Sequence, residues 1–291
     1  MTSSRVREFY WRFFRKRITS LLANIYRSSI TGAEKDIHRA RLDMKKIYAI
    51  LEMFEMLNPE KFDPGNFEVF KSLFRFSGKI RELQVNEIVI ARYGEPSQGM
   101  LAFNKYLHSR ENKLTKQFLS VVQDFDEKKL KTAERSIKKL CSEIKVKTLK
   151  ARSEKFILKK AKKISLLRFY PGNPENIHGI RKQLKSMVTI LTLVAMVFRD
   201  EKHEAILGKL NQTEMLIGNW HDNQVLMEYI DQFLHKHKSF SRECQLQLLV
   251  VRNKIIKDNQ ELLKALFPKI EEVLSVIFPS EEAHDENQGN L

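Results

Sequence analysis

The sequence feature that most limits the possible folds is an internal duplication with a constant offset. The segment DIHRARLDMK at residues 36–45 and the segment NIHGIRKQLK at residues 176–185 share a histidine, an arginine and a lysine at the same spacing. A second pair, FSGKIRELQV at 76–85 and LIGNWHDNQV at 216–225, repeats with the same offset of 140 residues. Two separate motifs in one register indicate duplication rather than chance. A repeat of this length predicts two domain-sized copies, not a short-period solenoid.

The pattern within each copy is helical. Only 10 Gly and 7 Pro occur in 291 residues, and apolar residues recur with the helical period between the clusters of breakers. Thr31, with Glu34 three residues later, is predicted to be the N-cap of the second helix. No segment shows convincing period-2 alternation, so the sequence predicts an all-α protein. The expected helices lie at about 3–28, 31–58, 67–93, from the break at 94–99 to 125, one or two within 126–163, and then at 175–199, 202–236 and 240–267.

The duplication and the charge distribution suggest three parts. Residues 1–125 are predicted to form the first helical-bundle repeat and residues 126–275 the second. The second repeat begins with a basic connecting segment, because residues 126–163 hold 15 Lys or Arg against 5 Asp or Glu. Residues 276–291 are acidic and polar, and we expect them to be a disordered tail.

The net charge limits the class of partner. The chain has 52 basic and 36 acidic residues, a formal charge of +16, which favours an anionic partner: nucleic acid, a polyphosphate or an acidic membrane surface. The most apolar run, residues 187–198, is too short to span a membrane. Two cysteines without metal-binding spacing exclude a disulfide scaffold and favour a reducing compartment. The first 18 residues do not resemble a secretory signal, so we expect a cytoplasmic protein.

The repeated motif predicts a basic stripe on each second helix. His38, Arg41 and Lys45 are spaced three and four residues apart, which places them on one helical face. Like charges at these spacings destabilise a helix by a few tenths of a kcal/mol per pair, so a bound anion would compensate. Apolar residues occupy the opposite face in both copies. The equivalent residues of the second copy are His178, Arg181, Lys182 and Lys185.

The second motif adds one basic or titratable residue to each copy. Arg81 stands at the position of His221, and an acid follows each, which we expect to orient its neighbour or a basic group on the adjacent helix. Gly78 and Gly218 fall within predicted helices, where glycine costs about 1 kcal/mol relative to alanine. A close approach of two helices is the predicted reason for these glycines.

At these motifs the sequence resembles the CHAD family, the conserved histidine α-helical domain, over residues 5 to 270. Members have tandem four-helix units whose second helix opens with His-x-x-Arg and further basic residues. The resemblance implies two four-helix bundles related by a pseudo-twofold axis, with a basic central channel or cleft. It implies non-enzymatic binding of inorganic polyphosphate, without a metal or cofactor, in the cytoplasm or at polyphosphate granules.

Carried over by position, the resemblance implies one set of polyphosphate-binding residues. Tyr48 and Val188 stand where members often carry another basic residue, and Ser186 stands opposite Lys46. These departures predict a less densely charged site than that of a usual member. The implied binding residues are His38, Arg41, Lys45, Lys46, Arg81, His178, Arg181, Lys182, Lys185 and His221.

Two alternative functions stay open from the sequence. The segment REFYWRFFRKR, residues 7–17, mixes aromatic and basic residues, as a single-stranded nucleic-acid binder or a membrane-surface binder would. An amphipathic helix with Phe9, Phe13 and Phe14 packed inward is the simpler interpretation of the same segment.

The second alternative is a metal-dependent phosphohydrolase, which would use a set of His and Asp residues as metal ligands. No HExxH motif or Gly-rich phosphate loop supports an enzyme, and the first copy has Arg81 where a metal ligand would be needed. That set would be His178, His203, His221, Asp222 and Asp231.

Overall fold

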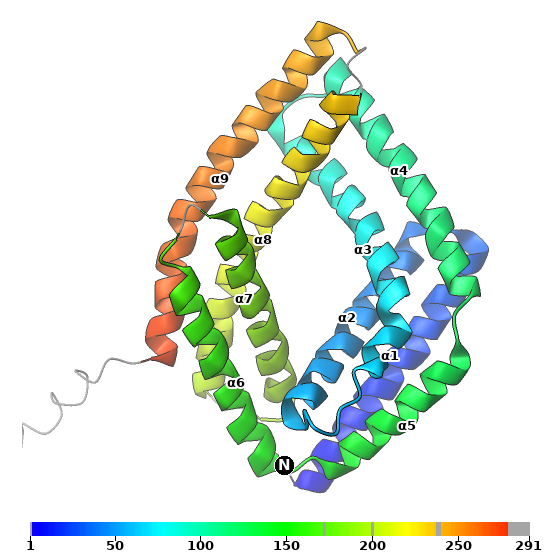
Figure 1. The fold of residues 1–291 in the computed structure, drawn as a ribbon, viewed down its shortest axis with the longest axis vertical. Helices are drawn as coiled ribbons and strands as arrows, with labels where there is room; N and C mark the ends of the chain where they lie inside the picture. The colour runs from blue at the N-terminus through cyan, green and yellow to red at the C-terminus, as the bar shows by residue number, and fades with distance from the viewer. Residues whose placement is uncertain (1, 171–172, 199–200, 237–239, 279–291) are drawn as a thin grey trace, which may run out of the picture. The chain divides into compact units, whose positions relative to one another are not determined.

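The protein is all-helical, as predicted, in the parts that the structure describes. A computed structural model describes residues 2–170, 173–198, 201–236 and 240–278, and within these ranges no β-strand occurs (Figure 1). The predicted tail lies mostly outside these ranges. The helices, drawn in Figure 1, are α1 (Ser3–Thr31), α2 (Glu34–Leu57), α3 (Gly65–Ile90), the short 3-10 helix η1 (Ala91–Tyr93), α4 (Gln98–Gln123), α5 (Glu127–Glu143), α6 (Val146–Leu167), α7 (Pro174–Ala195), α8 (Glu201–Lys236) and α9 (Arg242–Ile277).

Two predicted helix ends are wrong, the first for a local reason and the second because of packing in the core. Thr31 is the last residue of α1, which ends at Gly32 in the left-handed region with φ of 62°. The N-cap of α2 is Ala33, so the predicted Thr31 cap does not form. The last helix was expected to end near residue 267, yet α9 continues through Pro268 to Ile277. Buried residues on both sides of the proline, among them Leu266 and Ile270, hold the helix in the core.

The described residues form two compact units, each built from two stretches of the chain. Unit 1 comprises residues 1–149 and 222–257, and unit 2 comprises residues 150–221 and 258–291. These units do not follow the boundary predicted at residue 125, because α5 packs on α1 and α3 in unit 1. The repeat boundary itself, the pseudo-twofold axis and the central channel stay predictions.

In unit 1, a buried carboxylate joins α1 to α2. Asp43 is 4% exposed and accepts hydrogen bonds from Ser20 Oγ at 2.6 Å and Asn24 Nδ2 at 3.0 Å. Arg17 Nη1 completes this set at 3.1 Å from Asp43 Oδ1. Since these three donors precede Asp43 across a single short connection, α1 and α2 run antiparallel, as Figure 1 shows. The α2 face that carries the basic stripe is thereby fixed relative to its neighbours.

An apolar core of unit 1 lies between the hairpin of α3 and α4 and the adjoining parts of α8 and α9. It buries Leu83 and Ile90 of α3 with Phe103 and Leu107 of α4. Ile230 of α8 and residues of α9 pack in the same cluster. This core holds α3 and α4 side by side.

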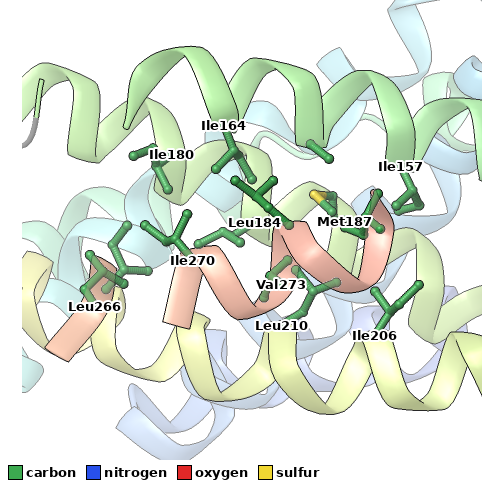
Figure 2. Packing of buried hydrophobic residues seen from close by; sticks show 14 of the residues in the cluster. Ile157, Ile164, Ile180, Leu184, Met187, Ile206, Leu210, Leu266, Ile270 and Val273 are labelled. Carbon is green, nitrogen blue, oxygen red and sulfur yellow. The ribbon is translucent and has the colours of Figure 1, made fainter. Parts of the chain in front are cut away.

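Unit 2 has a four-helix core. Figure 2 shows residues of α6, α7, α8 and α9 meeting, with Leu184 and Met187 of α7 among Ile164, Leu210 and Ile270. All five are buried, and this packing fixes which face of α7 points into the core. As in α2, the buried face of α7 places the motif residues on the other side of the helix.

Side-chain burial repeats along the chain and supports the duplication. Residues 71–86 and 211–226 have the same sequence of buried, half-buried and exposed positions at the offset of 140. The buried residues Val6, Tyr10 and Phe14 of α1 match positions 149, 153 and 157 of α6 at an offset of 143. Those of α4, residues 100, 103 and 107, match 248, 251 and 255 of α9 at an offset of 148. The connecting segments therefore differ in length between the copies while the helix faces are kept.

Candidate functional site

The structure brings the predicted residues of the first copy together on α2 and α3. Arg41 of α2 donates through Nη1 to the backbone oxygen of Phe74 at 3.2 Å, and its Cζ lies 4.9 Å from the centre of the Phe74 ring. Burial, and then the charge of Arg81, lowers the pKa of Arg41, with Glu82 acting in the opposite direction. Because like charges lower an arginine pKa only at short range, α2 and α3 form one basic cluster.

His38 lies within the same cluster. Burial is the largest cause that lowers its pKa, followed by the charges of Arg81, Lys45 and Arg41. Its Nδ1 atom is buried and makes no hydrogen bond to any described residue. An imidazole in this position is neutral near pH 7 in the absence of a ligand. We call His38, Arg41, Lys45 and Arg81 the α2 cluster.

The second copy forms a corresponding cluster on α7 and α8. The rings of His178 and His221 have centroids 5.8 Å apart and planes inclined by 44°. Burial lowers the pKa of His178, followed by the charges of Lys182 and Arg181. Burial, and then Arg181, His178 and Lys185, lowers the pKa of His221 to about 4. We call these five residues the α7 cluster.

One predicted residue does not share this environment. Lys46 is exposed and is not among the charges that lower the pKa of His38. Its counterpart Ser186 is 8% exposed. Since Lys46 follows Lys45 directly, it points about 100° away around the helix. Its assignment as a binding residue stays a prediction, and the α2 cluster accounts for the rest of the first copy.

Two aromatic contacts of the site could not be assigned from the motifs. Tyr48 stacks on Phe74 with centroids 4.6 Å apart, so the position that departs from the family pattern supports the ring on which Arg41 lies. Tyr229 donates through its hydroxyl to Glu82 Oε1 at 2.9 Å. The acid of the second motif thus has a partner on another helix. The position of Phe74, one helical turn before Gly78, indicates that its ring lies near this glycine, but no motif pairs the ring with Arg41.

Gly78 has a different role from the predicted close approach of helices. An ideal Cβ atom on residue 78 would lie 2.9 Å from Arg41 Nη1. Apart from its chain neighbours and the backbone of its own helix, no described atom lies within 4 Å of the corresponding position on Gly218. The first glycine makes room for an arginine side chain rather than for a backbone, and the second has open space.

The N-terminal aromatic segment is packed into unit 1. Tyr10 and Phe14 are fully buried, whereas Phe9 and Phe13 are half-buried, so the predicted inward set is correct for Phe14 alone. Arg15 and Lys138 each lie within 6 Å of the Trp11 ring centre, at 5.7 Å and 5.8 Å. Among the described residues no helix has the length and apolar character to cross a membrane.

The residues of the metal-site alternative have other contacts. Asp231 accepts two hydrogen bonds from Arg252, at 2.7 Å and 3.0 Å. His203 is 8% exposed and lines a small cavity of about 200 Å³ with mainly apolar neighbours. In the described part of the chain, the group that could hold a metal ion is instead Glu87, His108 and Glu111.

Comparison with known proteins gives consistent results. A family model described as the CHAD domain matches residues 12–231. Among solved structures, the chain is similar to one described as the crystal structure of the CHAD domain from the plant Ricinus communis, with a TM-score of 0.70 and 13% sequence identity over 91% of each chain. At this identity the likeness concerns the fold. A search of curated proteins found no match.

Proposed function

Because the chain belongs to the CHAD domain family, we propose that it binds inorganic polyphosphate through the α2 cluster and the α7 cluster. The observation that carries the proposal is the gathering of cations around a histidine in each cluster. After burial, which is the largest cause, the charges of Arg81, Lys45 and Arg41 lower the pKa of His38, and those of Arg181 and Lys185 lower that of His221. The cations therefore act at short range at two places that the duplication relates. A polyanion would relieve this repulsion.

The side chains present suit a linear phosphate polymer. An arginine can bond two phosphate oxygens at once, and lysine supplies a point charge to the same oxygens. Polyphosphate offers neither base edges nor stacking faces, so a receptor needs donors and positive charge only. The ring of Phe74, itself stacked on Tyr48, packs against the guanidinium of Arg41 and keeps it in place without a ligand.

Single-stranded nucleic acid is the competing ligand. Nucleic-acid binders of that class stack bases on exposed aromatic rings. In this chain Tyr10 and Phe14 are buried, and cations already lie over Trp11. The aromatic segment therefore favours polyphosphate over RNA as the preferred anion.

A charge-reversal experiment tests the proposal. Lys45→Glu with Lys185→Glu changes two exposed side chains and leaves the packed arginines intact. The matched control is Lys128→Glu with Lys129→Glu, two exposed lysines of α5 outside both clusters. Affinity for long-chain polyphosphate, measured by isothermal titration at two salt concentrations, should fall at least tenfold for the first pair and little for the second.

The same titration is repeated with single-stranded RNA in place of polyphosphate. Single-stranded RNA of similar charge should bind more weakly and be displaced by polyphosphate. Equal losses for the cluster pair and the α5 pair would mean that total surface charge, and not the duplicated clusters, is responsible. Preference for RNA would assign the chain to the competing class.

A further inference from the structure

A group of metal-binding side chains lies between α3 and α4, apart from both basic clusters. Glu87 of α3 and His108 and Glu111 of α4 each offer a donor atom, and these atoms all lie within 4.8 Å of one another. Glu87 and His108 line an open cavity of about 790 Å³ in unit 1, and the buried Glu111 lies next to them. His108 and Glu111 are three residues apart and therefore share a helical face.

The most buried member of the group is held in place by a hydrogen bond. Glu111 is 3% exposed, and its Oε1 accepts from Gln84 Nε2 at 2.7 Å. Its other oxygen, Oε2, lies 3.8 Å from His108 Nδ1. One carboxylate oxygen is thus fixed from behind, and the second is turned toward the imidazole. Such outer hydrogen bonds commonly orient metal-ligating carboxylates.

A fourth potential donor, an amide oxygen, belongs to a residue that lines the same cavity. Asn104 lines it one turn before His108, and its Oδ1 atom is buried without a hydrogen bond from any described residue. A buried oxygen of this kind costs free energy unless something bonds to it. A bound cation would satisfy it and would reduce the repulsion between the two carboxylates.

The second copy shows that the fold does not need these side chains. At the offsets that relate the helices, 140 for α3 and 148 for α4, Glu87 corresponds to Met227, and His108 to Ile256. Glu111 corresponds to Asn259, which is also buried. Apolar or neutral residues are sufficient at these places in one copy. The charged set of the first copy therefore calls for a reason other than packing.

We propose that Glu87, His108 and Glu111, with Asn104, bind one Zn²⁺ ion. An imidazole with carboxylate and amide oxygens suits Zn²⁺ better than Mg²⁺ or Ca²⁺, which prefer oxygen alone. Ligand atoms around zinc lie roughly 3.4 Å apart, since each bond is about 2.1 Å long. The exposed His108 and the half-buried Glu87 can rotate to reach that spacing while Glu111 stays fixed.

Three lysines at the cavity oppose cation binding, but weakly. Lys105, Lys113 and Lys116 line it, and all three are exposed. Their repulsion acts through solvent and is screened at physiological salt, where the Debye length is about 8 Å.

Metal binding to the full chain tests this site. Equilibrium dialysis against Zn²⁺, with the bound metal counted by atomic emission, should give one ion per chain. His108→Gln and Glu87→Gln should each weaken binding at least tenfold, while His235→Gln, an exposed histidine of α8, should not change it. Circular dichroism checks that each variant is folded. Absence of Zn²⁺ binding by the unchanged chain, or equal binding by all variants, would overturn the proposal.

A second pair of variants distinguishes a built site from casual binding by surface histidine. Gln84→Ala removes the hydrogen bond that positions Glu111 and should lower Zn²⁺ affinity, whereas the equivalent Gln224→Ala should not. Excess Mg²⁺ should not displace the bound Zn²⁺. Gln84 Oε1 also accepts a hydrogen bond from Arg81 of the α2 cluster at 3.5 Å, so Gln84→Ala touches both sites. The His108 and Glu87 variants are therefore the ones that separate this proposal from the polyphosphate titration.

Discussion

The guanidinium of Arg41 occupies the space that a side chain on residue 78 would need. Arg41 Nη1 lies 2.9 Å from the position of an ideal Cβ atom on Gly78, and the same nitrogen donates to the backbone oxygen of Phe74. A glycine in one helix thus fixes where an arginine of the neighbouring helix can lie. This relationship is absent around Gly218, where an added Cβ atom would meet no described atom within 4 Å beyond its own helix backbone and chain neighbours.

The two glycines provide a matched pair of substitutions. Gly218→Ala should raise the free energy of unfolding by about 0.5–1 kcal/mol, because alanine is the better helix former and has open space. Gly78→Ala should raise the free energy of unfolding by less, since Arg41 has to shift and loses a hydrogen bond that contributes about 1 kcal/mol. Urea denaturation measures both changes. Equal gains would show that Arg41 is not held by this packing.

Gly78→Ala also bears on ligand binding. If the Arg41 position matters for polyphosphate, affinity should fall in Gly78→Ala and stay unchanged in Gly218→Ala, although both proteins are folded. An unchanged affinity in both would mean that the guanidinium finds the ligand from another rotamer.

The sequence predicted most of the fold because the helical signals are local. The apolar period, the breakers at 58–66 and 170–176, and the duplication at 140 residues need no long-range information. The Thr31 cap failed since Gly32 can adopt the left-handed conformation, which lets α1 continue through Thr31. The helix predicted to end near residue 267 continues through Pro268, because core burial on both sides outweighs the lost backbone hydrogen bond.

The contacts around the site were less predictable. Spacing places His38, Arg41 and Lys45 on one stripe, but not the ring of Phe74 beneath Arg41. The pair His108 and Glu111 was visible as a spacing of three residues, yet Glu87 joins them only through the pairing of α3 with α4. Pairing of helices depends on which faces are buried and on the length of the connection, and neither is contained in a motif.

Polyphosphate binding should be accompanied by proton uptake. The pKa of His38 is lowered, and that of His221 is lowered to about 4, mainly by burial and then by nearby cations. A bound polyanion adds negative charge beside these rings and raises their pKa, so affinity should increase as the pH falls from about 7 to 5. Titration calorimetry in two buffers of different ionisation enthalpy counts the protons taken up.

In the absence of ligand, the lowered pKa values of the same histidines should make the fold less stable as the pH falls. A histidine whose pKa is lower in the folded state stabilises the fold above the unfolded pKa, which is about 6.5. That contribution is lost as the pH falls toward about 4, the folded value of His221. His221→Gln should therefore flatten the decline in melting temperature over this range, and His235→Gln should leave it unchanged. A steeper decline in His221→Gln would contradict the direction of the pKa shift.

Asp43 should be among the most sensitive positions of unit 1. Its carboxylate is buried with donors from Arg17, Ser20 and Asn24, and Asp43→Ala would leave the Arg17 charge and a buried amide without that partner. Breaking a buried pair of this kind costs about 3 kcal/mol of unfolding free energy. The equivalent residue of the second copy, Gln183, donates at 3.3 Å to a backbone oxygen of its own helix. Gln183→Ala should cost less than about 1 kcal/mol, and a cost equal to that of Asp43→Ala in urea denaturation would refute the assigned role.

Pro268 should reduce the stability of the last helix. It lies inside α9 on the exposed side, where proline removes the hydrogen bond to the carbonyl four residues earlier and crowds it. Pro268→Ala should therefore raise the free energy of unfolding by about 1–3 kcal/mol. Pro174 is the first residue of α7, where the backbone N–H that proline lacks would make no hydrogen bond within the helix. Pro174→Ala should therefore leave the free energy of unfolding unchanged, and it serves as the control. No gain from Pro268→Ala would mean that a bend at the proline is itself required to bury Leu266 and Ile270 together, and that packing in unit 2 stabilises α9 more than its own hydrogen bonds do.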